Sequence, residues 1–130
     1  MTIDPITDML NQIRNGQAVQ KPEISVTLSN LKYEVAKVLV DAGFIQEVKK
    51  TVKGKIKTMK IVLKYDNGIP TISGLKRVSK PGQRIYAKLH DIKNVRGGYG
   101  ISVVSTPKGL MTNKEARKQR LGGEVLCEIW

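Results

Sequence analysis

A short apolar run that ends abruptly in turn-forming residues constrains this fold more than any other feature. Residues 101–104 read Ile-Ser-Val-Val, which predicts a buried strand, and Ser-Thr-Pro-Lys-Gly follows at 105–109. Proline fixes φ and glycine tolerates positive φ, so this loop is short and stiff. Its two hydroxyls and one ammonium group suit an anionic, hydroxyl-rich surface such as RNA. The same residue types also form ordinary tight turns, and both interpretations stay open at this point.

An excess of basic residues favours a polyanionic partner. The 130 residues include 23 lysines and arginines against 11 acidic residues, which gives a net charge of +12. Neutralising phosphates releases counterions and so drives binding to nucleic acids. A membrane surface would require a basic amphipathic helix or a polybasic tail, and both ends of this chain are close to neutral. No signal peptide or membrane span is apparent, so we expect a cytoplasmic protein that binds no membrane.

The sequence contains few candidate catalytic or metal-binding residues. The one histidine, His90, lies in a charged stretch, and the one cysteine, Cys127, lies in an apolar strand where a buried hydrophobe is expected. Asp4 and Asp8 are four residues apart, but Asp4 is better explained as a helix cap. The glycines at 97–100 match no phosphate-binding motif, and no acidic, histidine and cysteine cluster has metal spacing. We therefore expect neither an enzyme nor a cofactor.

The spacing of apolar residues predicts an α+β fold with two small lobes. Residues 1–79 form an N-terminal lobe of the α-β-α-β-β type with one more strand, and residues 80–130 form a mostly β, RNA-binding lobe with short helices. The expected helices span residues 5–15, 30–43, 89–95 and 113–121. The expected strands span residues 23–28, 44–52, 55–65, 71–79, 84–88, 101–104 and 124–130.

Capping residues and glycine turns set the expected ends of these elements. Asp4 fits the N-cap of the first helix, Ser29 or Asn30 that of the second, and Thr112 with Glu115 fits a capping box before the last helix. The second helix is expected to bury one face, made of Leu31, Val35, Val38 and Leu39. Turns are expected at residues 15–16, 53–54, 66–68 and 122–123.

A run of lysines has two interpretations. Seven lysines lie between Lys49 and Lys64, with no acidic residue among them. They either protect the edge of a sheet from pairing or face the phosphates of a nucleic acid. Sequence alone leaves these interpretations equal.

Tyr86 lies among cations that include Lys80 and Arg84. Its ring could stack on a base or a ribose while its neighbours hold phosphates, or it could be a core ring with its hydroxyl at the rim. We favour RNA contact because Arg84 and Tyr86 would share one face of a strand. Asn15, Arg14 and Lys32 lie near the ends of the first two helices, where they form a smaller polar patch or only cap and solvate the helices.

Three segments together resemble the bacterial S-eight family of small-subunit ribosomal proteins. They are DPITDMLNQIRNGQ at 4–17, RVSKPGQRIY at 77–86 and GYGISVVSTPKGLMTNKEARKQRLGGEVLCEIW at 98–130. The resemblance implies a structural constituent of the small subunit that binds the central domain of 16S ribosomal RNA and helps to assemble the platform. It also implies neighbouring small-subunit proteins as partners and suggests repression of its own operon mRNA.

The resemblance also implies which residues contact RNA. Ser105 and Thr106 would bond the RNA backbone and base edges in an irregular helix, and Glu124 would brace or contact the RNA. Pro107 stands where bacterial members often carry a third hydroxyl residue, so any hydrogen bond from that position is lost. The full expected RNA-binding set is Ser105, Thr106, Lys108, Gly109, Tyr86, Arg84, Lys80, Glu124, Arg14 and Lys32.

Two other functions would explain part of the sequence. An architectural protein for duplex DNA would account for the charge, but would show no preference for RNA. A scaffold that binds neighbouring proteins through the lysine hairpin would leave the Ser-Thr loop without a role.

Overall fold

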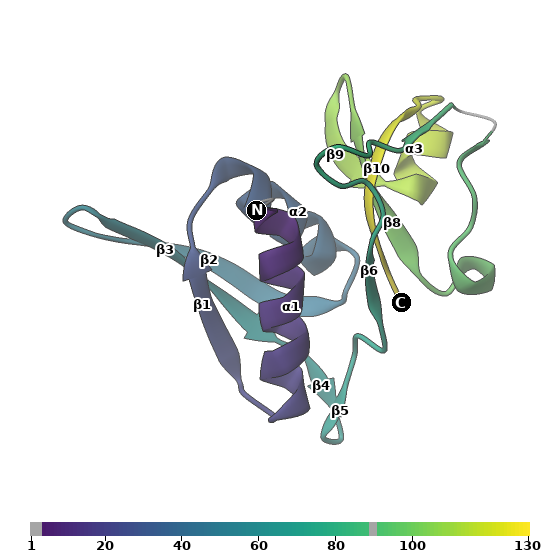
Figure 1. Ribbon diagram of the computed structural model, residues 1–130. Coiled ribbons are helices and arrows are strands. Elements are labelled where there is room, and N and C mark those ends of the chain that lie inside the picture. The colour runs from purple at the N-terminus through teal and green to yellow at the C-terminus, as the bar shows by residue number, and fades with distance from the viewer. Residues whose placement is uncertain (1–3, 89–90) are drawn as a thin grey trace. The chain divides into compact units, whose positions relative to one another are not determined.

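The computed structural model describes residues 4–88 and 91–130, which form two compact units (Figure 1). One unit is Pro5–Ile72, and the other joins Ser73–Trp130 to Asp4. Helices alternate with strands in the first unit, and the second is mainly a sheet with a short helix. The predicted α+β fold class is therefore confirmed.

The first unit packs two helices against an antiparallel sheet. The helices are α1 (Pro5–Ala18) and α2 (Asn30–Asp41). The sheet has the order β1-β3-β2, and a two-stranded hairpin, β4 with β5, follows it. These strands are β1 (Glu23–Thr27), β2 (Ile45–Lys53), β3 (Ile56–Leu63), β4 (Tyr65–Asp66) and β5 (Ile69–Pro70). Burial alternates along β1 and the second half of β3, so one face of the sheet forms the core.

The helices differ from expectation at two places. α1 does not end at Asn15-Gly16 but continues to Ala18. Gly16 packs so closely on β1 that a Cβ there would lie 2.7 Å from Cγ2 of Ile24, so this glycine serves packing and not termination. On α2, Val35 and Leu39 are buried as expected, whereas Leu31 is exposed and Lys32 takes a buried position instead.

The turns of this unit follow local chemistry. Asn67 and Gly68 both have positive φ between β4 and β5, as an Asn-Gly hairpin requires. The β2–β3 turn consists of Gly54 and Lys55, one residue later than expected, because Lys53 pairs with Ile56. The end of the β2–β3 hairpin that carries this turn extends past β1 and both helices of the unit (Figure 1).

The second unit is built around the last strand. Its sheet has the order β6-β10-β8-β9, and β7 also pairs with β10. These elements are β6 (Leu75–Arg77), β7 (Tyr86–Ala87), β8 (Ile101–Thr106), β9 (Gly109–Thr112), α3 (Asn113–Lys118) and β10 (Gly123–Ile129), with a short 3-10 turn, η2 (Arg96–Gly98), before β8. Val103, Val104 and Cys127 are fully buried between these strands.

The strand expected at 71–79 is shorter and lies in the second sheet. It comprises only Leu75–Arg77 and pairs with β10, so it does not close the first lobe. The amides of Ser73 and Gly74 donate to the carbonyl of Trp130, which starts this pairing. A Cβ on Gly74 would lie 2.4 Å from the Trp130 ring, so the ring packs directly on this backbone.

Other elements of the second unit also differ from expectation. β9 was not expected, and it forms because Pro107 and Lys108 close a two-residue hairpin after β8. α3 ends at Lys118 and not at residue 121, since Arg120 adopts positive φ and the Leu121 amide bonds back to the Ala116 carbonyl.

Two further expectations concern residues 84–95. The expected strand at 84–88 is limited to Tyr86–Ala87. The expected helix at 89–95 begins on Leu89 and His90, which lie outside the described residues, and residues 92–94 are not helical. Val95 forms an isolated bridge with Gly100 instead.

Candidate nucleic-acid interface

The turn after β8 is held by one threonine hydroxyl. Thr106 pairs with Gly109 across the hairpin, and its Oγ1 donates to the Gly109 carbonyl at 2.7 Å. The same oxygen accepts from the Lys108 amide at 3.2 Å, and Thr106 is only 8% exposed. Because the hydroxyl hydrogen is used within the turn, Thr106 can offer a partner only its remaining acceptor position.

The residues around this hydroxyl remain available to a partner. Pro107 and Lys108 are exposed, and Lys108 takes part in no ion pair within the described chain. Gly109 is exposed with a φ of +115°, which an L side chain rarely adopts. Ser105 is partly exposed, and its hydroxyl has no hydrogen-bond partner among the described residues. The turn therefore presents one cation, one free hydroxyl and bare backbone.

Glycine at 123 lets β10 approach the end of β8. A Cβ on Gly123 would lie 2.0 Å from the Ser105 carbonyl oxygen, which no rearrangement of a side chain could relieve. The next residue, Glu124, pairs with Ser105 on one side and with Tyr86 on the other. Tyr86, Glu124 and Ser105 thus form one row across β7, β10 and β8, which we call the Tyr86–Ser105 row.

Glu124 ties the segment before β7 to the sheet. Its carboxylate accepts from the Ser79 hydroxyl and, at 3.1 Å, from Nη1 of Arg84. Ser79 is fully buried, and its oxygen also accepts from the Ile85 amide at 3.1 Å. Only 17% of the Glu124 side chain is exposed, whereas 51% of Arg84 is. Glu124 therefore acts as a brace that leaves the guanidinium open to a partner.

The surroundings of Glu124 favour its charged form. Burial raises the pKa of this carboxyl, but the Ser79 hydrogen bond and the positive charges of Arg84 and Arg77 outweigh burial and lower the pKa below its ordinary value. The brace is consequently an ionised hydrogen-bond acceptor at neutral pH.

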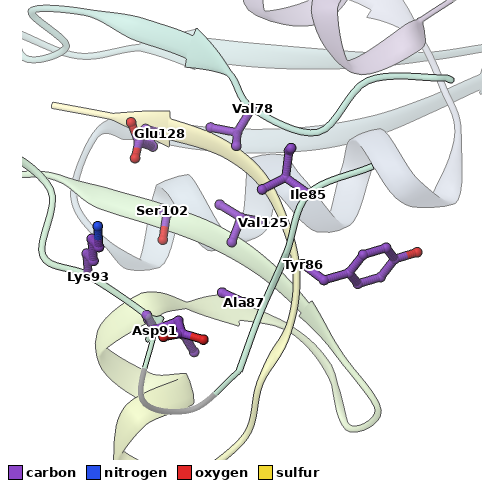
Figure 2. Close-up of a pocket in the computed structure, with 10 residues that line it drawn as sticks. Val78, Ile85, Tyr86, Ala87, Asp91, Lys93, Ser102, Val125 and Glu128 are labelled. Carbon is purple, nitrogen blue, oxygen red and sulfur yellow. The ribbon is translucent and has the colours of Figure 1, made fainter. Parts of the chain in front are cut away.

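The remaining sequence-predicted residues divide between the two units. Tyr86 is 71% exposed, and Figure 2 shows its ring pointing away from the sheet; Lys80 is exposed in the turn that bridges to Gln83. Tyr86 belongs to the Tyr86–Ser105 row, and Lys80 lies in the segment before it. Arg14 and Lys32 belong to the first unit: Arg14 is exposed on α1 and donates to Asn11 at 3.0 Å, whereas Lys32 is buried on α2.

The residue that sequence reasoning missed is Ser79. It lies 45 positions from Glu124, its main partner, and no local pattern marks it. Only its place between two cations in RVSKPGQR hinted that this segment has a role.

Within the described residues, no three acidic, histidine or cysteine side chains are grouped as metal ligands. The helices in that part of the chain are too short or too polar to cross a membrane.

Comparison with known proteins assigns the family. The family model described as Ribosomal protein S8 matches residues 4–130. The chain belongs to this family. It is 47% identical over 131 residues to small ribosomal subunit protein uS8 of Solibacter usitatus, covering the whole of both chains. It is 48% identical over 128 residues to the protein of the same name from Clostridioides difficile, covering 98% of this chain and 97% of that one. The resemblance inferred from three segments is thereby confirmed, and in this S8-family chain those segments include both ends of the Tyr86–Ser105 row.

Proposed function

We propose that this S8-family chain is a structural, non-catalytic component of the small ribosomal subunit that binds the central domain of 16S ribosomal RNA at an irregular helix. The observation that carries the proposal is the Tyr86–Ser105 row, which lies beside the hairpin turn at 106–109. The row brings together residues that stand far apart in the sequence and that suit RNA. The names of the relatives support the choice of ribosomal RNA.

The chemistry of the turn matches an RNA backbone. Lys108 would pair with a phosphate, and the free Ser105 hydroxyl would donate to a phosphate or a base edge. The remaining acceptor position on Thr106 suits a donor, which the ribose 2′-hydroxyl supplies in RNA but not in DNA. Gly109 has no side chain, so a sugar or phosphate can approach its backbone closely.

The residues on the other side of the row complete the interface. Tyr86 would lie against a base or ribose, while Arg84 and Lys80 hold phosphates. Arg84 is pre-positioned for this by its bond to Glu124. Arg14 on α1 would make a separate contact from the first unit; Lys32 is the weakest member of the set because it is buried.

The wider role follows from that interface. A protein that binds an irregular RNA helix through a rigid turn would help to assemble the platform of the subunit. It would contact neighbouring small-subunit proteins there, on ribosomes in the cytoplasm. The same surface would bind the mRNA of its own operon if that mRNA copied the ribosomal helix, and binding would then repress translation.

A gel-shift competition tests this function against its alternatives. We expect an internally looped RNA helix to bind far more tightly than a matched duplex DNA or an unstructured RNA of equal length. Equal affinity for the looped RNA and the DNA would favour an architectural DNA-binding protein. Weak binding to every nucleic acid, with retention of ribosomal proteins, would favour a protein scaffold.

A further inference from the structure

A cavity of about 470 Å³ lies in the second unit, on the sheet beside β7 (Figure 2). Its apolar walls come from Val78, Ile85, Ala87, Ile92 and Val125. Four polar residues of the described chain also line it, namely Asp91, Lys93, Ser102 and Glu128. The backbone of Tyr86 borders it, while the Tyr86 ring points away from the other lining side chains in Figure 2. The cavity therefore shares β7 and β10 with the Tyr86–Ser105 row, but Val125 directly follows Glu124 on β10, so the cavity lies on the other face of the sheet.

The polar groups of this cavity have unused hydrogen-bonding capacity. Ser102 is 4% exposed, yet its hydroxyl has no hydrogen-bond partner among the described residues. Glu128 lies directly opposite Ser102 in the β8–β10 register, on the same face of the sheet. Within the described chain, the side chains of Glu128, Asp91 and Lys93 take part in no hydrogen bond and no ion pair. Of these groups, Ser102 is buried and Glu128 is half-buried, whereas Asp91 and Lys93 are exposed. A buried or half-buried group gains stability when a ligand satisfies it.

The charges of the lining disfavour a phosphate as the occupant. The lining contains two carboxylates, Asp91 and Glu128, and one ammonium group, Lys93. Lys76 lies opposite Glu128 on β6, but it is exposed and makes no ion pair with Glu128. Carboxylates repel a phosphate and accept from N–H groups. A flat, apolar ligand fits between the apolar walls, and N–H donors on one of its edges would bond the carboxylates. A nucleobase has that chemistry.

We propose that this cavity receives one unpaired guanine that leaves the stack of the bound RNA. The proposal rests on the RNA-binding function proposed above. The base lies between the apolar walls, and its N1–H and exocyclic amino group donate side by side to the two oxygens of Glu128. Lys93 donates to the guanine O6, and Ser102 bonds the remaining edge. Guanine is favoured because adenine and uracil do not present two parallel donors to one carboxylate.

The RNA side of the test uses a looped helix that carries a single unpaired nucleotide. Guanosine, inosine, adenosine and an abasic residue are placed in turn at that position. Inosine lacks the exocyclic amino group and so removes one of the two bonds to Glu128. We expect guanosine to bind about tenfold more tightly than inosine or adenosine, and the abasic RNA to bind most weakly.

The protein side of the test uses Glu128→Gln with Glu34→Gln as its matched control. Glu34 is an exposed glutamate on α2 in the first unit. Glu128→Gln should abolish the preference for guanosine over inosine, because an amide cannot accept both donors, whereas Glu34→Gln should preserve it. A second variant, Ala87→Trp, should fill the cavity and lower the affinity for the guanosine-containing RNA to that for the abasic RNA. Circular dichroism and thermal melting confirm that each variant is folded.

The outcomes separate this site from the proposed function. If the wild-type protein binds all four RNAs equally but still prefers them to duplex DNA, the guanine site is wrong and the RNA-binding function stands. If the guanosine preference survives Glu128→Gln in a folded protein, the base is read elsewhere and the site is also wrong. If no RNA is preferred to DNA, the proposed function itself fails.

Discussion

Two adjacent hydroxyls in the same turn do different work. The Thr106 hydroxyl makes two bonds within the turn, while the Ser105 hydroxyl makes none. The exposure of candidate residues such as Lys108 and Tyr86 could be predicted from sequence, because local turn and charge patterns mark them. Which of the two hydroxyls is bonded within the turn could not be predicted, since that depends on which carbonyl each side chain contacts after the hairpin closes.

The turn predicts opposite phenotypes for Thr106→Val and Ser105→Ala. Thr106→Val removes both bonds inside the hairpin and leaves the Gly109 carbonyl without its donor, so it should lower the free energy of unfolding by about 1–3 kcal/mol. Ser105→Ala should leave stability within about 0.5 kcal/mol and weaken binding to looped RNA by about 1 kcal/mol. Denaturant unfolding and filter binding check the pair. Equal stability loss in both would contradict the assignment.

Lys108 is expected to act through charge alone. Lys108→Gln should weaken binding to cognate and non-cognate RNA alike and flatten the log–log dependence of affinity on salt by about one unit. Thr106→Val, which changes no charge, serves as the control and should leave the slope as it was. A slope that Lys108→Gln does not change would show that this ammonium group touches no phosphate.

The Glu124 brace predicts a pH dependence of stability. An unfolded glutamate has a pKa of about 4.3, and the folded value is lower, so the brace stabilises fully above that range. The stabilisation is lost as the pH falls through the folded pKa. The stability gap between wild type and Glu124→Gln should therefore stay constant from neutral pH to mild acid and shrink below about pH 4. Unfolding measured at each pH checks this, and a gap that widens in acid would refute it.

At the scale of elements, prediction succeeded where a single local residue decides the geometry. Ser29 caps α2 through the Lys32 amide, and Thr112 caps α3 through the Glu115 amide. The reciprocal half of the Thr112–Glu115 capping box is not made within the described residues, where the Glu115 carboxylate accepts from Gln119. β6 and β9 were misjudged for another reason: their length and partner are set by strands that pair with them, not by their own residues.

The β2–β3 hairpin predicts a salt-dependent contact at its tip. In the middle of the hairpin, Lys49 and Lys60 pair with acidic residues at 3.6 and 3.9 Å, and Lys50 covers the Tyr33 ring at 4.3 Å. The lysines of the exposed tip make no such contacts within the described chain; they are Lys53, Lys55 and Lys57.

Replacing those three tip lysines by glutamine should therefore flatten the salt slope of RNA binding by about one to three units. Replacing Lys49 and Lys60, which are already paired, is the matched control and should change the slope less. An unchanged slope in the tip variant would mean that these lysines only protect a sheet edge.

For the whole molecule, the expected domains, 1–79 and 80–130, remain a prediction, and the pairing of β6 provides a way to test it. The amides of Val78 and Ser79 donate to the carbonyls of Leu126 and Val125 on β10, so hydrogen bonding ties residues 78–79 to the second sheet.

Native-state hydrogen exchange can locate this boundary. Val103→Ala deletes two methyl groups from a fully buried site on β8 and should destabilise the second unit by about 1–3 kcal/mol. The Val78 and Ser79 amides should then exchange faster, together with the amides of β8, while those of β1 and β3 keep their rates. If Val78 and Ser79 instead follow β1 and β3, the first domain does extend to residue 79.

The position of β10 in the sheet has a consequence for synthesis. β10 lies between β6 and β8 and also pairs with β7. Three strands that are translated earlier therefore pair with a strand that is translated after them. Until residues 123–129 leave the translating ribosome, β6 and β7 have no partner strand, and Glu124 cannot hold Ser79 and Arg84. The proposed RNA-binding surface therefore forms late and all at once, and a nascent chain that has folded only its first unit does not yet have the Tyr86–Ser105 row.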